Sequence, residues 1–137
     1  MDKVFIGIDP GVKTGLAISV NKQLVELVTT DIMSAQDWVL DKINYHSDHI
    51  VCISIENPNL RRWYGTNADA KKQGAGSIKR DFSIWKKFFK QHAIPYQEKN
   101  PKDLKTKINA ESFQRITKWK GRTSEHSRDA AMQIFGK

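Results

Sequence analysis

The fold of this 137-residue chain is decided by the stretch at residues 4–9, Val-Phe-Ile-Gly-Ile-Asp. Its apolar, largely β-branched and aromatic residues predict a buried strand over residues 4–8, and an aspartate follows that strand directly. Two further runs of the same kind occupy residues 16–20 and 24–30. The connections between the three runs are so short that they predict an antiparallel meander.

Helices and strands alternate after this meander. We expect helices over residues 35–45, 77–92, 109–118 and 124–135, and strands over residues 50–56 and 94–97. Ser34 is the expected N-cap of the first helix, and the polar residues 57–76 are expected to form a long loop. Because a helix precedes the strand at 50–56, that strand should return parallel to the first one. The order β-β-β-α-β-α-β-α predicts an α/β layer sandwich with a mixed five-stranded sheet, in one domain over residues 1–137.

The composition favours a nucleic-acid partner. Lysine and arginine number 23 against 15 aspartates and glutamates, so the formal charge is +8 and the isoelectric point is near 9.6. A basic balance of this kind favours polyanions through contacts with phosphates. Cys52 is the only cysteine, which excludes an internal disulfide, and the sequence shows neither a membrane span nor a signal-peptide pattern. We therefore expect a cytoplasmic protein with no membrane partner and no small-molecule cofactor.

Three carboxylates stand where the predicted elements would bring them together. Asp9 and Glu56 each close an apolar strand, and Asp129 lies in the last helix, followed by small residues that permit close packing on a sheet. Clustered carboxylates repel one another and lose hydration, so they persist mainly where a cation compensates them. Hard oxygen ligands suit Mg²⁺ or Mn²⁺, and two such ions can activate a water for phosphoryl displacement. The alternative interpretation is three unrelated acids near the ends of surface elements.

Three motifs place these carboxylates in a family context. Residues 6–11 with 15–17 resemble the opening motif of RuvC-type Holliday junction resolvases, residues 55–58 their second motif, and residues 126–131 their C-terminal motif. The resemblance covers almost the whole chain in the right order, and residues 73–81 look closest to small phage- or prophage-type members. It implies an RNase H-like fold. It also implies a crossover junction endodeoxyribonuclease that resolves four-way DNA junctions by paired nicks, with two Mg²⁺ ions in each site.

The resemblance further implies a site of four catalytic and metal-binding residues. Three positions match Asp9, Glu56 and Asp129. The fourth lies one helical turn before the last acid, where members carry aspartate or histidine, and this chain has His126 there. A neutral imidazole can bind a metal or transfer a proton. Glu125, one turn before Asp129 at i,i+4 spacing, is the alternative for this position.

Basic and aromatic residues outside the site predict contacts with DNA. Guanidinium groups beside aromatic rings can bind phosphates while the rings stack on unpaired bases. The family places an aromatic residue at the junction centre, a role open to Trp63 or Tyr64, although Trp63 could instead anchor the loop. Gly74 and Gly76 at the expected helix start would expose backbone N–H groups to a phosphate. The residues predicted to bind DNA are Arg61, Arg62, Trp63, Tyr64, Lys71, Lys72, Lys79, Arg80, Lys102 and Lys105.

The aromatic residues of the helix at 77–92 predict a homodimer. The apolar face of this helix is wider than one core-facing stripe requires, because it holds Phe82, Trp85, Phe88 and Phe89. We therefore expect Trp85 or Phe88 to face outward. The resemblance implies a dimer through this helix, and a two-fold dimer would present two active sites to a four-way junction. Packing in the core is the alternative explanation of the stripe.

Three other functions are compatible with parts of the pattern. A related RNase H-like nuclease could act on structured RNA through the same carboxylates. An actin-like nucleotide-binding module shares the Asp-Pro-Gly sequence at residues 9–11, but that architecture normally needs two such domains. A DNA-binding protein with an inactive site is the third, and the intact acids count against it.

Overall fold

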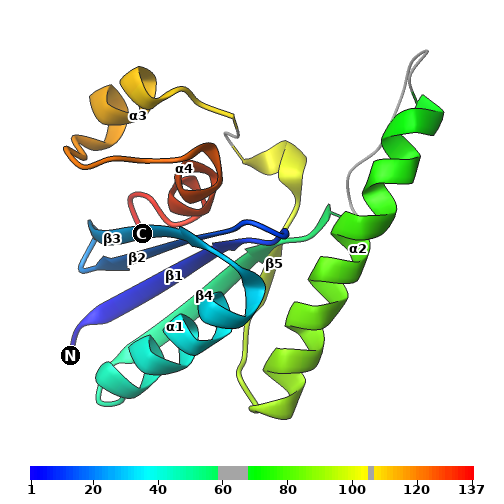
Figure 1. Ribbon diagram of the computed structural model, residues 1–137. Helices are drawn as coiled ribbons and strands as arrows, with labels where there is room; N and C mark the ends of the chain where they lie inside the picture. Colours follow the sequence, from blue (N-terminus) through cyan, green and yellow to red (C-terminus); the bar gives the residue numbers. More distant parts are fainter. Residues whose placement is uncertain (59–67, 105–106) are drawn as a thin grey trace.

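A mixed sheet of five strands lies at the centre of the computed structural model (Figure 1), which describes residues 1–58, 68–104 and 107–137, with the backbone alone at 68–75 and 78. The strands are β1 (Lys3–Asp9), β2 (Thr14–Val20), β3 (Gln23–Thr30), β4 (Ile50–Glu56) and β5 (Gln97–Lys99), in the order β3-β2-β1-β4-β5. The first three strands form an antiparallel meander, and β4 pairs parallel with both β1 and β5. The predicted meander and the parallel return of residues 50–56 are confirmed.

Helices cover both faces of this sheet. Helices α1 (Ile32–Tyr45) and α2 (Ala68–Gln91) lie over one face, and α3 (Ala110–Thr117) and α4 (Glu125–Met132) lie over the other (Figure 1). The alternation of side chains along β1 builds both cores, because Ile6 and Ile8 pack under α1 and α2 whereas Phe5 packs with α3 and α4. The same alternation points Asp9 toward α4. The predicted α/β class with a mixed five-stranded sheet is therefore confirmed.

Both edges of the sheet have distinct features. At one edge, β3 pairs with β2 through a register shift between Ile18 and Ser19, which marks a bulge. On β3, Glu26 points inward and accepts hydrogen bonds from Trp38 Nε1 at 3.0 Å and Lys42 Nζ at 2.7 Å, both on α1. At the other edge, β5 has three residues. Among the helices in the described part of the chain, not one has both the length and the apolar character that crossing a bilayer requires.

Several element boundaries differ from the predicted ones. Helix α1 begins at Ile32, because Asp31 rather than Ser34 is the N-cap and its carboxylate accepts a hydrogen bond from the Ser34 amide at 2.8 Å. Helix α2 begins at Ala68 instead of residue 77, so the second half of the segment predicted as a loop is helical. This stretch holds alanine, lysine and glutamine, which favour helix strongly enough to outweigh its glycines.

The last elements also shift. Strand β5 begins at Gln97 instead of residue 94, because the Ile94 amide bonds to the Phe89 carbonyl at 2.8 Å and completes the end of α2. Helix α4 ends at Met132 rather than residue 135. The final residues continue as hydrogen-bonded turns, in which the Phe135 amide donates to the Ala131 carbonyl at 2.9 Å.

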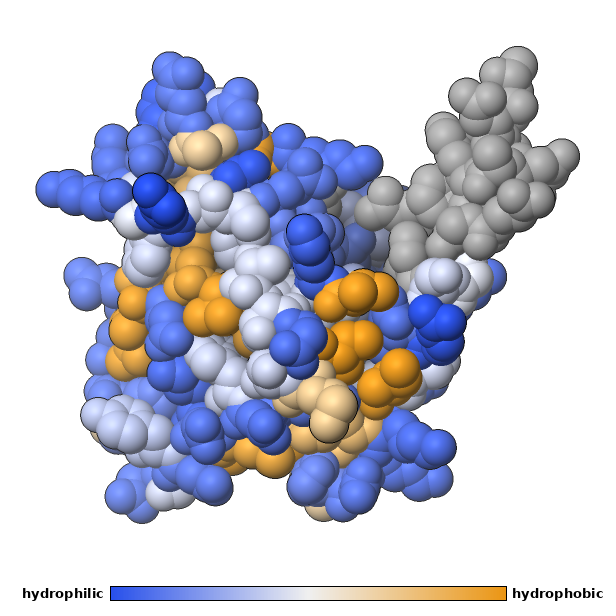
Figure 2. Space-filling model, viewed as in Figure 1, coloured by the Kyte–Doolittle hydropathy of each residue, from blue (hydrophilic) through white to orange (hydrophobic). Residues whose placement is uncertain are grey.

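The aromatic residues of α2 are buried within the chain. Phe82, Trp85, Phe88 and Phe89 are 1%, 0%, 6% and 1% exposed, and Trp85 packs edge-on against Phe88. The expectation that Trp85 or Phe88 faces outward is wrong, because the layer between α2 and the sheet is wide enough to take all four rings. These side chains are therefore not available as a dimer interface. Figure 2 shows hydrophobic surface on this face in separate places, beside α2 and on the β3 side of the sheet, among hydrophilic side chains.

Two glycines allow α4 to lie directly on the strands. A Cβ atom added to Gly15 would stand 2.0 Å from the carbonyl oxygen of His126, and one added to Gly7 would stand 2.2 Å from that of Ala130. Real atoms do not approach so closely, so any side chain at either position would push the helix away. Alanines 130 and 131 are fully buried against the sheet and complete this close packing.

We expect Gly15→Ala to lower the free energy of unfolding by about 1–3 kcal/mol, the range for forcing a methyl group into a packed core. Gly76→Ala is the matched control, since a Cβ atom at Gly76 in α2 meets nothing within 4 Å. That control should raise stability by about 0.5–1 kcal/mol, because alanine favours helix over glycine. Urea denaturation followed by circular dichroism measures both changes. Equal stability of the two variants would contradict the close packing of α4.

Candidate active site

Two acidic side chains lie next to each other at the carboxyl ends of the central strands. Ile8 of β1 is paired in register with Ile55 of β4, so the residues that follow them, Asp9 and Glu56, are neighbours. Both are buried, at 9% and 6% exposure. The Glu56 side chain interacts with the Asp9 carboxyl and slightly opposes the rise that burial causes in the pKa of Asp9. The predicted juxtaposition of these two acids is therefore observed.

Helix α4 brings two more predicted site residues to this end of the sheet. Ser124 caps the helix by accepting a hydrogen bond from the Ser127 amide, and the Ser127 side chain bonds back to the Ser124 amide. In the first turn after this cap, His126 Nδ1 lies 3.0 Å from Asp9 Oδ2. One turn later Asp129, 8% exposed, accepts a hydrogen bond from the Lys107 amide at 2.8 Å.

The alternative fourth residue, Glu125, lies outside this cluster. Its side chain is exposed at the start of α4, whereas the His126 ring contacts Asp9 directly. Of the two residues that the sequence left open, His126 is thus the one in contact with the carboxylates.

Burial dominates the electrostatics of the site. Burial raises the pKa of Asp9, and the negative charge of Asp129 raises it further. The hydrogen bond with His126 acts in the opposite direction and lowers it. Burial also raises the pKa of Asp129, with the charge of Glu56 adding to the effect and the Lys107 amide opposing it. The hydrogen bond to Asp9 raises the pKa of His126 although partial burial acts the other way. The carboxylates thus stand in an environment that disfavours their ionised forms.

The chemistry of these donors fits a hard divalent cation. Carboxylate oxygens are the ligands that Mg²⁺ and Mn²⁺ take in proteins, and a cation would offset the cost of ionising buried acids. Within the described residues, the side chains as they stand do not form a group of three or more histidine, cysteine or acidic ligands around a single point. Asp9 is instead engaged with His126 and Glu56. The donor set therefore suits a metal, while its side chains contact one another in the arrangement described here.

A buried glutamine at the end of α4 is hydrogen-bonded to both central strands. The sequence pattern did not indicate this residue. Gln133, 1% exposed, follows the last turn of α4. Its Nε2 donates to the Ile8 carbonyl at 2.7 Å, and its Oε1 accepts from Ser54 Oγ at 2.8 Å. These contacts lie one residue before Asp9 and two before Glu56. The one sequence signal was Ser54, a hydroxyl inside an otherwise apolar strand.

The residues predicted to bind DNA lie partly within the described structure. Lys79 and Arg80 are exposed on α2, and Lys102 is exposed on a short 3-10 helix (Pro101–Asp103) after β5. The rest lie outside the described side chains: Arg61, Arg62, Trp63, Tyr64 and Lys105 entirely, and Lys71 and Lys72 except for their backbone.

One part of the predicted DNA surface is corrected by the structure. Gly74 and Gly76 lie inside α2 rather than at its start, because the helix begins at Ala68. Their amides belong to a helix interior, where N–H groups bond to carbonyls one turn earlier. The predicted phosphate site at a helix N-terminus is therefore wrong at this position.

Comparison with known proteins adds no family to this site. No protein-family model matches the chain, and no curated protein matches it significantly.

We expect Gln133→Met to lower the free energy of unfolding by about 1–3 kcal/mol, because it leaves the buried Ile8 carbonyl without its donor. Ser54→Ala removes only the second contact and should cost about 1 kcal/mol. Since the two residues share a hydrogen bond, the double variant should cost less than the sum of the single ones. Denaturant titration of the four proteins measures this, and strict additivity would contradict the contact.

Asp9→Asn should raise the melting temperature of the metal-free protein by a few degrees. The pKa of Asp9 is raised in the folded state, so ionisation costs stability as pH rises from the usual aspartate value through the raised one. The gain should therefore be full at pH 8 and shrink as the pH falls through the usual aspartate value toward about 3, where the carboxyl is largely protonated in both states. Thermal melts in EDTA across this range test it, with exposed Asp37→Asn on α1 as control. A destabilised Asp9→Asn at pH 8 would contradict this account.

Proposed function

We propose that this chain is a metal-dependent endonuclease of RNase H-like fold that cuts branched DNA, four-way junctions in particular. The observation that carries the proposal is the convergence of Asp9, Glu56 and Asp129 from three separate elements, with His126 in contact with Asp9. Acids buried together at the open end of a sheet cost stability, as the raised pKa values of two of them indicate. A site that binds cations for phosphodiester hydrolysis accounts for that cost.

Each of the four side chains has a distinct role in the proposed hydrolysis. When bound, Mg²⁺ supplies an activated water and charge for an in-line displacement at phosphorus. Asp9, between Glu56 and His126, holds the central position among the donors, and Glu56 and Asp129 complete the carboxylate set. As the water oxygen bonds to phosphorus, the water gives up a proton, which a carboxylate of the site can accept. The bond to the leaving oxygen breaks in the same step, and that oxygen takes up a proton. His126, half-exposed with its pKa raised by Asp9, can hold and deliver a proton there.

The charge of the chain supports DNA as the substrate. A formal charge of +8 favours a polyanion, and Lys79, Arg80 and Lys102 present exposed cations on α2 and after β5. The preference for a four-way junction rests on the resemblance of the three motifs around the acids. Paired nicks need two sites, which a two-fold homodimer would supply. Its interface must lie elsewhere than the four aromatic side chains of α2 that are buried in the core.

Incubation with a labelled four-way junction, a linear duplex and a structured RNA, each with Mg²⁺ and with EDTA, tests this function. We expect paired nicks in the junction with Mg²⁺ alone. Loss of a residue that only supports a metal ligand costs about 10- to 100-fold in activity, so Asp9→Asn and Asp129→Asn should each lose more than that. Exposed Asp37→Asn should retain full activity.

The substrates separate the alternatives. Cleavage of the RNA with the junction left intact would assign the site to RNA. Full cleavage in EDTA, or by the Asp9→Asn protein, would remove the metal mechanism altogether.

A further inference from the structure

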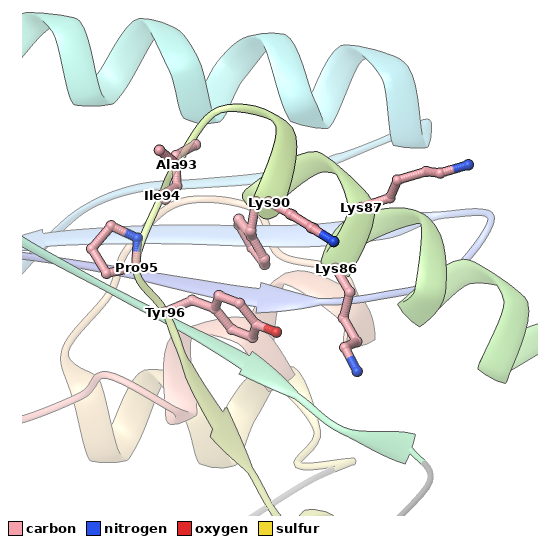
Figure 3. Close-up of a pocket in the computed structure, with 8 residues that line it drawn as sticks. Lys86, Lys87, Lys90, Ala93, Ile94, Pro95 and Tyr96 are labelled. Atoms are coloured by element: carbon pink, nitrogen blue, oxygen red, sulfur yellow. The ribbon is translucent and has the colours of Figure 1, made fainter.

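A hollow of about 700 Å³ lies beside the C-terminal end of α2, on the side of the sheet that α1 and α2 cover. Lys86, Lys87, Phe89 and Lys90 line it from the helix, and residues 93–96 line it from the connection to β5 (Figure 3). Its volume is within the range of about 300–1,000 Å³ typical of ligand sites. Asp9 and Glu56 face α4 on the other side of the sheet, so the hollow is separate from the candidate active site.

The floor of the hollow is aromatic and firmly held. The rings of Phe89 and Tyr96 are stacked, with centroids 4.4 Å apart and planes 25° apart. Phe89 is buried in the core, and the hydrogen bond from the Ile94 amide to its carbonyl fixes the connection that carries Tyr96. Tyr96 is only half-buried, so part of its ring is open to the hollow.

The rim of the hollow is cationic without local compensation. Lys86 and Lys90 stand four residues apart on one face of α2, a spacing at which like charges destabilise a helix by about 0.2–0.5 kcal/mol. Attraction to the helix dipole accounts for Lys90 in the last turn, but it does not extend to Lys86 and Lys87. The ion pairs between described residues include none of the three. Lys86 Nζ also lies 5.9 Å from the centroid of the Phe82 ring, a contact that does not neutralise its charge. The positive charges of the three lysines therefore remain available to an anionic partner.

We propose that this hollow binds a nucleic-acid strand, with Lys86 and Lys90 contacting phosphates and the Tyr96 ring contacting a sugar or an unpaired base. In Figure 3 Lys86 and Lys90 lie on the side of the Tyr96 hydroxyl, whereas Lys87 extends away from it. Cations beside an exposed aromatic ring match a strand that offers anionic phosphates and flat bases together. The inference rests on the proposed function only in taking nucleic acid as the substrate. Since the hollow is separate from the carboxylates, it would hold a part of the substrate that is not cut.

The test compares two double variants that change the formal charge equally, each from +8 to +4 by two Lys→Glu substitutions. Lys86→Glu with Lys90→Glu alters the hollow, and Lys3→Glu with Lys22→Glu alters exposed lysines at the start of β1 and in the β2–β3 turn. Binding of a fluorescent four-way junction is measured in EDTA by anisotropy over a range of salt. The hollow variant should bind about tenfold more weakly, with a salt slope smaller by about two, one unit for each lost phosphate contact. The control should bind within about twofold of the original protein, since neither Lys3 nor Lys22 lines the hollow.

A third variant tests the ring. Tyr96→Leu keeps apolar bulk beside Phe89, so circular dichroism should show a folded protein. Loss of base stacking should weaken binding of a single strand by about fivefold or more, and a blunt duplex by much less. Equal weakening of both would show that the ring contacts no unpaired base, and would overturn that part of the proposal.

The outcomes distinguish nucleic-acid binding in the hollow from nuclease activity. If both double variants weaken binding equally while the protein still cuts junctions, the binding role of the hollow is wrong and the proposed nuclease activity is supported. If the protein binds DNA through Lys86 and Lys90 but never cuts it, the hollow stands and the nuclease fails. If the hollow variant loses affinity for polyglutamate but not for DNA, the hollow binds acidic protein and the proposal is overturned.

Discussion

Direct backbone contact between α4 and the sheet is the constraint on which the rest of the site depends. At Gly7 and Gly15 the strands have no side chain, and the helix carbonyls of Ala130 and His126 occupy the space that a Cβ atom would need. These two contacts fix the height of α4 above the strands. Because α4 lies so close to the strands, the short side chain of His126 is long enough to contact Asp9 directly.

The site combines buried carboxylates, whose ionisation is unfavourable, with hydrogen bonds that stabilise the surrounding structure. Burial and mutual repulsion raise the pKa values of Asp9 and Asp129, which opposes folding of the ionised protein. Gln133 acts in the other direction, because it bonds α4 to the strands on which Asp9 and Glu56 lie. Proteins commonly accept such a local cost where activity needs it and recover stability elsewhere. Here the cost and its compensation lie within a few residues of each other.

The sequence was sufficient to predict those candidate site residues whose positions follow from where strands end or from helical spacing. Asp9 and Glu56 each close an apolar run, and two parallel neighbouring strands bring such positions together by register alone. His126 and Asp129 follow from helical spacing once α4 is placed. Gln133 could not be found in this way, because its partner Ile8 is 125 positions away and the contact exists only in three dimensions.

Packing and capping were harder to predict for two different reasons. The width of the layer under α2 decides whether its aromatic residues are core or surface, and no periodicity reports that width. Asp31 and Ser34 are both good N-cap residues within one turn of each other, so composition alone does not choose between them.

The edges of the sheet limit how copies of this chain can associate. An open edge strand offers unpaired N–H and C=O groups, which invite another strand and lead to aggregation. Here β3 is bent by a bulge and carries the inward-pointing Glu26, while β5 at the opposite edge is only three residues long. Each of these features discourages the continuation of the sheet into a neighbouring molecule. If copies of this basic chain gather along DNA, as the proposed function requires, these edges protect them from forming intermolecular β-structure.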